Sequence, residues 1–250
     1  WTRIAGSSWN DSGHAACADA AGNVYVAGQA DGPFDGQPAA AGIDLCLIKY
    51  DGAGSRQWTR IWGSSNHDYG RALCVDTGGN VYVSGVTYGS FDGQTNMGGG
   101  DFLLSKYDAS GSRQWTRIWG SAGYDCGSEV SIGIGGVYVC GKGNDGACLA
   151  KFDFDGVKLW TRLWGSGSSA YAAVSRNGEI YVTGDTPAPF DGQAVSGGND
   201  VWLSKWLDNL PPNAVVAASP RSGPAPLRVT FDCGQSTDPD TYIVRWEVDR

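Results

Sequence analysis

Charged residues are scarce in this chain of 250 residues, since they make up only 18% of it and leave a net charge of −8. The sequence contains no cluster of basic residues, and an acidic chain without one repels the phosphate backbone of nucleic acids. It also contains no apolar run long enough to cross a membrane as a helix. These absences predict that the chain has no nucleic-acid partner and no membrane-spanning segment.

Signatures of catalysis and of metal binding are lacking as well. The sequence has no CxxC pair of the kind that holds zinc, no Gly-x-Ser-x-Gly turn, no zinc-protease helix and no phosphate-binding loop. Asp153-Phe-Asp-Gly156 and Asp238-Pro-Asp240 place carboxylates two residues apart, but neither supplies the further oxygen ligands of a calcium loop. We therefore expect no metal site, no cofactor, no catalytic residue and no enzymatic activity.

Repetition dominates what is present. The stretch Gln57-Trp-Thr-Arg-Ile-Trp-Gly63 returns as Gln114-Trp-Thr-Arg-Ile-Trp-Gly120, with near copies at Leu159-Trp-Thr-Arg-Leu-Trp-Gly165 and Trp1-Thr-Arg-Ile-Ala-Gly6. Self-similarity at a spacing of roughly 45 to 57 residues is the signature of a repeat array. The chain also combines 39 Gly, which suit turns, with 11 Trp, which give large buried faces. We expect residues 1–208 to form one repeated architecture.

Each repeat contains four stretches with strand character. The Trp-Thr-Arg stretch is the fourth, and β-branched and aromatic residues favour strand in the second and third. The second stretches are Val24-Tyr-Val-Ala-Gly28, Val81-Tyr-Val-Ser-Gly85, Val137-Tyr-Val-Cys-Gly141 and Ile180-Tyr-Val-Thr-Gly184. Four short antiparallel strands per repeat describe the blades of a β-propeller, in which both faces of each blade pack on neighbours.

These motifs, with the third stretches at Asp44-Leu-Cys-Leu-Ile-Lys-Tyr50 and Asp101-Phe-Leu-Leu-Ser-Lys-Tyr107, resemble the bacterial β-propeller repeat called SBBP. The resemblance covers four copies in residues 1–208. The third copy departs from it, because its link Lys142-Gly-Asn-Asp-Gly146 is about a dozen residues shorter than the others. The resemblance implies a secreted or cell-surface bacterial protein, usually of several domains, and no catalytic residues.

The composition changes after the repeats. Asn209-Leu-Pro-Pro-Asn213 is a Pro-rich linker that a helix or a central strand would not tolerate. In residues 214–250, the stretches Ser222-Gly-Pro-Ala-Pro-Leu227 and Ser236-Thr-Asp-Pro-Asp240 resemble the opening half of a PKD domain. The expected fold is therefore all-β: a propeller of four-stranded antiparallel blades, followed by a truncated immunoglobulin-like β-sandwich.

Candidate binding residues come from the links between strands. In a propeller, the links between second and third strands share one end with the blade-to-blade links, and loops on such a rigid scaffold commonly bind ligands. Aromatic rings beside carboxylates and amides suit sugar recognition. The candidates in the long links are Phe34, Asp35, Gln37, Phe91, Asp92, Gln94, Phe190, Asp191 and Gln193. Those in the blade-to-blade links are Trp9, Asp11, His67, Asp68, Tyr69, Tyr124 and Asp125.

The same residues also fit a structural interpretation, which we weigh more heavily. Phe-Asp-Gly-Gln recurs at one repeat position, as expected of a turn whose Phe plugs the gap between blades. Asp11, Asp68 and Asp125 recur in register, as expected of side chains that bind backbone amides.

The seven cysteines are expected to be mostly free and buried. Cys17 and Cys74 share one repeat position, as do Cys46 and Cys148, and small or apolar residues fill these positions in other repeats. Cysteine in such a position behaves as a small hydrophobe.

Together these patterns predict a non-catalytic extracellular scaffold or binding module of a bacterial secreted or cell-surface protein, with glycans or surface proteins as partners. The alternative is an accessory targeting portion of a secreted hydrolase whose catalytic domain lies outside this chain. The chain starts within a repeat and without Met, so we interpret it as a mature or truncated piece of a larger propeller. In a larger propeller or in a closed ring of four blades alike, Trp1–Gly6 should be extended and should not pair with the strand at Val24–Gly28. Pairing with Asp200–Trp206 would show that the four repeats close into a ring.

Overall fold

The computed structural model describes residues 1–176, 178–190, 192–208, 217–219 and 230–232. It divides the chain into two compact units, Trp1–Trp206 and Leu207–Arg250. Every regular element in the described residues is a β-strand.

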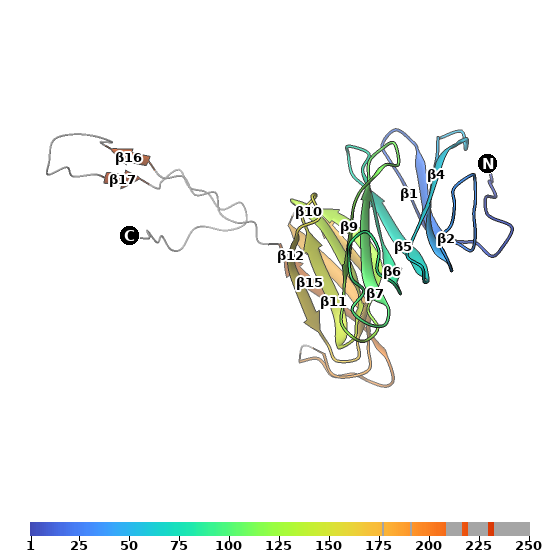
Figure 1. Cartoon of the computed structure of the whole chain (residues 1–250). Helices are drawn as coiled ribbons and strands as arrows, with labels where there is room; N and C mark the ends of the chain where they lie inside the picture. Colours follow the sequence, from blue (N-terminus) through green and yellow to red (C-terminus); the bar gives the residue numbers. More distant parts are fainter. Residues whose placement is uncertain (177, 191, 209–216, 220–229, 233–250) are drawn as a thin grey trace. The chain divides into compact units, whose positions relative to one another are not determined.

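The first unit consists of four antiparallel sheets whose strands follow one another in chain order (Figure 1). In the described residues, three of these sheets have four strands and the last has three. Small antiparallel sheets of four strands are typical of β-propeller blades. Blade 1 contains β1 (Ser12–Ala18), β2 (Val24–Ala30), β3 (Asp44–Tyr50) and β4 (Arg56–Trp62). Blade 2 contains β5 (Asp68–Val75), β6 (Val81–Thr87), β7 (Asp101–Tyr107) and β8 (Arg113–Trp119). Blade 3 contains β9 (Cys126–Gly133), β10 (Gly136–Gly143), β11 (Gly146–Phe152) and β12 (Lys158–Trp164). Blade 4 contains β13 (Ser169–Arg176), β14 (Glu179–Thr186) and β15 (Asp200–Leu207).

The core lies between blades rather than within any one of them. Leu45 and Leu47 of β3 point toward blade 2 and share a cluster with Leu103 and Tyr107 of β7. The alternate residues of β7, Phe102 and Leu104, join the next cluster with blade 3. Because successive side chains of a strand point to opposite faces, each inner blade buries both of its faces against neighbours.

The Trp-Thr-Arg stretch fastens blade 1 to a turn of blade 2, and blade 2 to the equivalent turn of blade 3. Arg60 of β4 donates from Nε to the carbonyl of Gly111 at 2.7 Å, and Arg117 of β8 donates in the same way to Gly156 at 2.6 Å. These turn glycines have φ of +79° and +80°, which favours glycine. A side chain on either would also collide with the ring of Trp58 or Trp115. We call this contact the Trp-Arg clamp.

Trp1–Gly6 lies in no assigned strand. Strand β2, which contains Val24–Gly28, pairs with β1 and β3, as expected. Strand β15, which contains Asp200–Trp206, pairs with β14 and forms the edge of its sheet. Trp1–Gly6 therefore closes no four-bladed ring within this chain.

The thiols follow the predicted pattern. The six described cysteines are free, and four of them are buried: Cys46, Cys126, Cys140 and Cys148. Burial raises the pKa of the Cys46 thiol to about 12, so this thiol stays protonated at neutral pH. Cys233 lies outside the described residues.

The second unit is described only in two short strands, β16 (Ala217–Ser219) and β17 (Thr230–Asp232), which pair antiparallel. The expected linker at 209–213 and most of the expected PKD-like region at 214–250 lie outside the described residues.

Each second strand carries a glycine at the same repeat position for a steric reason. Gly85 of β6 lies opposite Gly70 of β5, where the register shifts by a bulge. A Cβ at Gly85 would overlap the carbonyl oxygen of Tyr69, and the equivalent glycines Gly28, Gly141 and Gly184 meet equivalent carbonyls. The close approach of the first two strands therefore needs a residue without a side chain at this position.

Substituting Gly85→Ala should lower the free energy of unfolding by about 1–3 kcal/mol, because the added methyl group forces β5 and β6 apart. Gly197→Ala is the control, since nothing lies within 4 Å of a Cβ there. Urea unfolding measures both variants, and equal stabilities would show that the bulge tolerates a side chain.

Candidate functional site

The aspartates of the blade-to-blade links hold their own loops. Asp68 Oδ2 accepts hydrogen bonds from the backbone N of Ser64 at 2.6 Å and from its Oγ at 2.9 Å. Asp11 and Asp125 accept equivalent bonds from Ser7 and Ser121. The expected hydrogen bonds from backbone amides are therefore present at all three aspartates, whose carboxylates cap loops at the blade junctions.

Two of these links also bring two carboxylates close together, Asp44 with Asp68 at Gly63 and Asp101 with Asp125 at Gly120. Asp44, at the start of β3, and Asp68, at the start of β5, both lie against Gly63, and both are fully buried. Asp44 Oδ2 accepts from the backbone N of Ala40, while its Oδ1 has no hydrogen-bond partner in the described residues. Burial, and then the charge of Asp68, raise the pKa of Asp44 to about 6.

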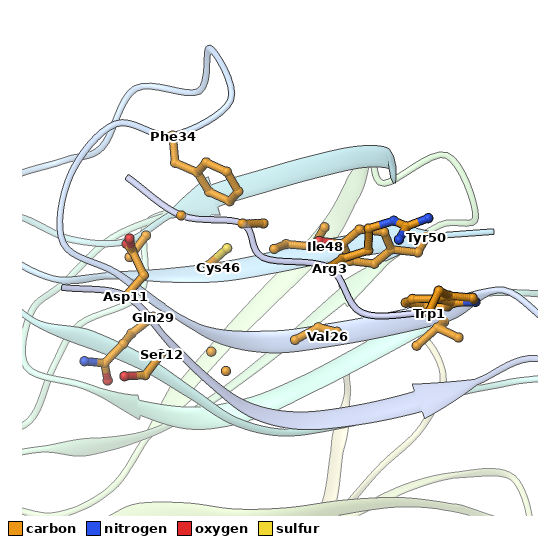
Figure 2. A pocket seen from close by; sticks show the side chains of 16 residues that line it. Trp1, Arg3, Asp11, Ser12, Val26, Gln29, Phe34, Cys46, Ile48 and Tyr50 are labelled. Carbon is orange, nitrogen blue, oxygen red and sulfur yellow. The ribbon is translucent and has the colours of Figure 1, made fainter. Parts of the chain in front are cut away.

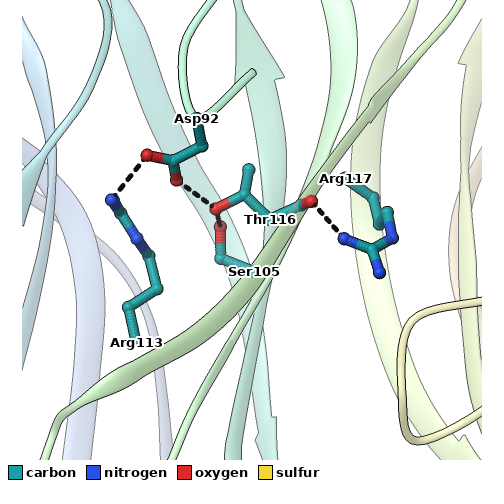
Figure 3. Close-up of polar contacts among 5 residues, drawn as sticks. All are labelled: Asp92, Ser105, Arg113, Thr116 and Arg117. Carbon is teal, nitrogen blue, oxygen red and sulfur yellow. Dashed lines mark hydrogen bonds and ion pairs between the residues drawn. The ribbon is translucent and has the colours of Figure 1, made fainter. Parts of the chain in front are cut away.

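The Phe-Asp-Gly-Gln turns of blades 1 and 2 pack against the outermost strand of their blade. Asp35 and Asp92 have φ of 56° and 52°, a left-handed conformation that aspartate tolerates in turns. Asp35 forms an ion pair with Arg56 at 2.6 Å, and Asp92 forms one with Arg113 at 2.7 Å. Asp92 also accepts a hydrogen bond from Thr116 Oγ1 in the middle of β8 (Figure 3). Through these contacts the two carboxylates hold the long links against their blades.

Two of the three Phe rings in these turns are buried in the blade packing. Phe34 is 7% exposed and Phe190 is 8% exposed, and Phe190 stacks on Trp202 with ring centroids 5.0 Å apart. Phe91 packs against the cluster between blades 1 and 2. The rings fill gaps in the blade packing, as the structural interpretation proposed. Gln37, Gln94 and Gln193 meet their Phe through the backbone, and Asp191 lies outside the described residues.

Four other aromatic side chains form a continuous row on the links around blade 2. Their centroids follow one another at 6.2 Å from His67 to Tyr69, 6.2 Å from Tyr69 to Tyr88 and 6.3 Å from Tyr88 to Tyr124. Tyr88 is 38% exposed and Tyr124 is 39% exposed. We call these four residues the aromatic row. Three of them were expected from the sequence, whereas Tyr88 was not, because its position holds Asp31 and Pro187 in other repeats.

Polar groups hold and border the aromatic row. Asn66 Nδ2 donates to the carbonyl of Tyr88 at 3.0 Å, and His67 Nδ1 accepts from the backbone N of Ile43 at 3.1 Å. Burial raises the pKa of Tyr69 and of Tyr124, so both phenols keep their protons and can donate hydrogen bonds at neutral pH. The row therefore offers ring faces together with hydroxyl donors.

Two further hollows lie on blade 1. Trp9 is exposed and lines a shallow groove with Pro33 and Pro38. A cavity of about 230 Å³ lies under the N-terminal residues, between Trp1, Arg3, Phe34 and Tyr50 (Figure 2).

In the part of the chain that the structure describes, no group of three or more His, Cys, Asp or Glu side chains is placed to hold a metal ion. The same residues include no helix of the length and apolarity that crossing a membrane requires.

Four-stranded antiparallel sheets that stack in chain order, joined by a repeated clamp, define this chain as a β-propeller repeat protein. In agreement, residues 57–92 match the family model of SBBP, the beta-propeller repeat. The chain is also similar to the regulatory protein FlaEY of Caulobacter vibrioides, with 33% identity over 136 residues. That alignment covers 48% of this chain and 14% of FlaEY, so the chain spans only a small part of its relative's length.

The pair Asp44–Asp68 should make stability depend on pH. The pKa of Asp44 is about 6 in the folded protein and near 3.8 when unfolded, so the folded state binds the proton more tightly. The stability that protonated Asp44 contributes is therefore fully present below its pKa in the unfolded chain. It is lost as the pH rises through about 6, its pKa in the folded protein. Asp44→Asn keeps an acceptor for the Ala40 amide but removes the titration. We expect urea unfolding to show a smaller loss of stability between about pH 4 and pH 7 in this variant than in wild type. Equal losses would mean that Asp44 titrates normally.

Proposed function

We propose that this chain is a non-catalytic binding module whose aromatic row holds a carbohydrate ligand. The observation that supports this most is the continuous row His67–Tyr69–Tyr88–Tyr124, two of whose rings are more than one third exposed. Exposed phenol rings present flat apolar faces, onto which the C–H faces of a sugar ring stack.

The scaffold supports this proposal by fixing the row. Asn66 and His67 anchor the loops that carry it, and the buried Asp68 caps the link between blades 1 and 2. Loops held on a rigid scaffold bind with a smaller entropic cost than loops that order on binding. Phenol hydroxyls would then select among sugar hydroxyl groups through directed hydrogen bonds.

A secreted or cell-surface bacterial setting suits such a module and is part of the proposal. As an alternative, the chain serves as the accessory targeting portion of a secreted hydrolase. FlaEY is described as a regulatory protein, and a binding module within a regulatory protein is compatible with the same proposal, with a glycan or a surface protein as its partner.

A panel of soluble bacterial polysaccharides, measured by isothermal titration calorimetry, tests the proposal. For a polysaccharide that binds, Tyr88→Ala and Tyr124→Ala should each weaken binding about tenfold, or about 1.4 kcal/mol, through loss of one stacking surface. Tyr171→Ala on blade 4 is the matched control, since this tyrosine is also exposed but lies outside the row. Failure of the whole panel to bind, or equal losses in all three variants, would overturn the proposal.

A further inference from the structure

The bulge in the first strand of blade 2 presents an arginine. Strand β5 shifts register between Gly70 and Ala72, so Arg71 lies opposite no residue of β6. A bulge re-aims the side chain of its extra residue, and bulges are over-represented next to active sites. Residues of different chemistry occupy the equivalent bulges of the other three blades: His14, Ser128 and Tyr171. The repeat therefore fixes the bulge, while the side chain that it presents differs from blade to blade.

Contacts from blade 1 hold the residue before Arg71 in place. His14 Nδ1 donates to the carbonyl of Gly70 at 2.9 Å, since a carbonyl oxygen can only accept. Gly70 also lies so close to Leu45 and to the carbonyl of Gly28 that little space remains for a Cβ. The side chain of Arg71 thus starts from a fixed point on the scaffold.

The fold makes no use of the Arg71 guanidinium. Arg71 is exposed, and it forms no hydrogen bond or ion pair in the described residues. The arginines of the outermost strands differ in this respect. Arg60 and Arg117 donate to carbonyls of the next blade, and Arg56 and Arg113 pair with aspartates of their own blade. Arg71 therefore keeps its planar set of N–H donors for a ligand.

The charge of Arg71 lies beside the aromatic row. Burial raises the pKa of Tyr69 and of Tyr124, and the positive charge of Arg71 opposes the rise at both phenols. Burial also raises the pKa of Cys126, the first residue of β9, and Arg71 opposes that rise as well. The guanidinium is therefore near the junction of blades 2 and 3, at the end of the row where Tyr88 and Tyr124 are exposed.

The surrounding charges make Arg71 a local exception. The chain carries a net charge of −8, so an anionic ligand gains nothing from its overall charge. Asp31 and Asp68 also act on Tyr69, but neither pairs with Arg71 in the part of the chain that the structure describes. Any preference of the row for an anion has to come from Arg71.

We propose that the carbohydrate held by the aromatic row is acidic, and that its carboxylate pairs with Arg71 while its ring stacks on Tyr88 or Tyr124. This inference rests on the proposed carbohydrate function and names the substrate class, an oligomer or polymer of uronic acids. A guanidinium presents two parallel N–H donors that match the two oxygens of a carboxylate. A neutral sugar would stack on the same rings without using Arg71.

Isothermal titration calorimetry with matched pairs of sugars tests the inference. The probes are oligomers of galacturonate, glucuronate and mannuronate, each beside its carboxyl-reduced neutral form. For a pair that binds, wild type should prefer the acidic form about tenfold, as expected of hydrogen bonds between charged groups. Arg71→Gln should abolish this preference by weakening the acidic form alone, and Arg71→Lys should retain part of it. Arg176→Gln, at an exposed arginine at the end of β13, controls for the loss of one positive charge.

The outcomes separate this inference from the proposed function. If both forms bind equally and Tyr88→Ala weakens both, the row holds a carbohydrate but does not select its charge, and this inference is overturned. Equal losses in Arg71→Gln and Arg176→Gln, or equal weakening of both forms by Arg71→Gln, would also overturn it. If neither form of any probe binds and the polysaccharide panel fails as well, the proposed function fails and this inference fails with it.

Discussion

The contact on which the rest of the fold depends is the Trp-Arg clamp between successive blades. No blade buries both faces of its sheet alone, so each needs a neighbour to remove its apolar side chains from water. The clamp fixes where that neighbour lies, since Arg117 donates to two carbonyls in the turn of blade 3 while its guanidinium lies 5.2 Å from the centroid of the Trp115 ring. The indole rings of Trp58 and Trp115 pack directly against the turn glycines Gly111 and Gly156.

Much of the fold could be predicted from the sequence because the same strand motifs recur in four repeats. Four copies of the Trp-Thr-Arg and Val-Tyr-Val stretches reveal the strands, and glycines at fixed positions reveal the turns. The short link of the third repeat also agrees with the sequence, because β10 and β11 are joined directly by a turn between Gly143 and Gly146. What repetition could not predict is the clamp, since sequence does not show which carbonyls Arg60 and Arg117 reach.

The candidate site was harder to predict, because the repetition that reveals the strands does not show which side chains meet across blade junctions. Residues that recur in three of the four repeats, such as the link aspartates and the Phe-Asp-Gly-Gln turns, hold loops and links in place. The aromatic row depends on side chains that differ between repeats, such as Tyr88, and on distances across blade junctions. In a repeat protein, a feature common to all copies serves the shared packing, whereas a single ligand site depends on departures from the repeat.

The clamp is tested most directly by comparing two arginines on one strand. Arg117 donates across the blade junction, whereas Arg113 forms a partly exposed ion pair within its own blade. Urea unfolding of Arg117→Met should show a loss of about 1.5–3 kcal/mol, the range for hydrogen bonds from a charged group. Arg113→Met should cost less than about 1 kcal/mol, as surface ion pairs do. Equal losses in the two variants, or a larger loss for Arg113→Met, would contradict the central role of the clamp.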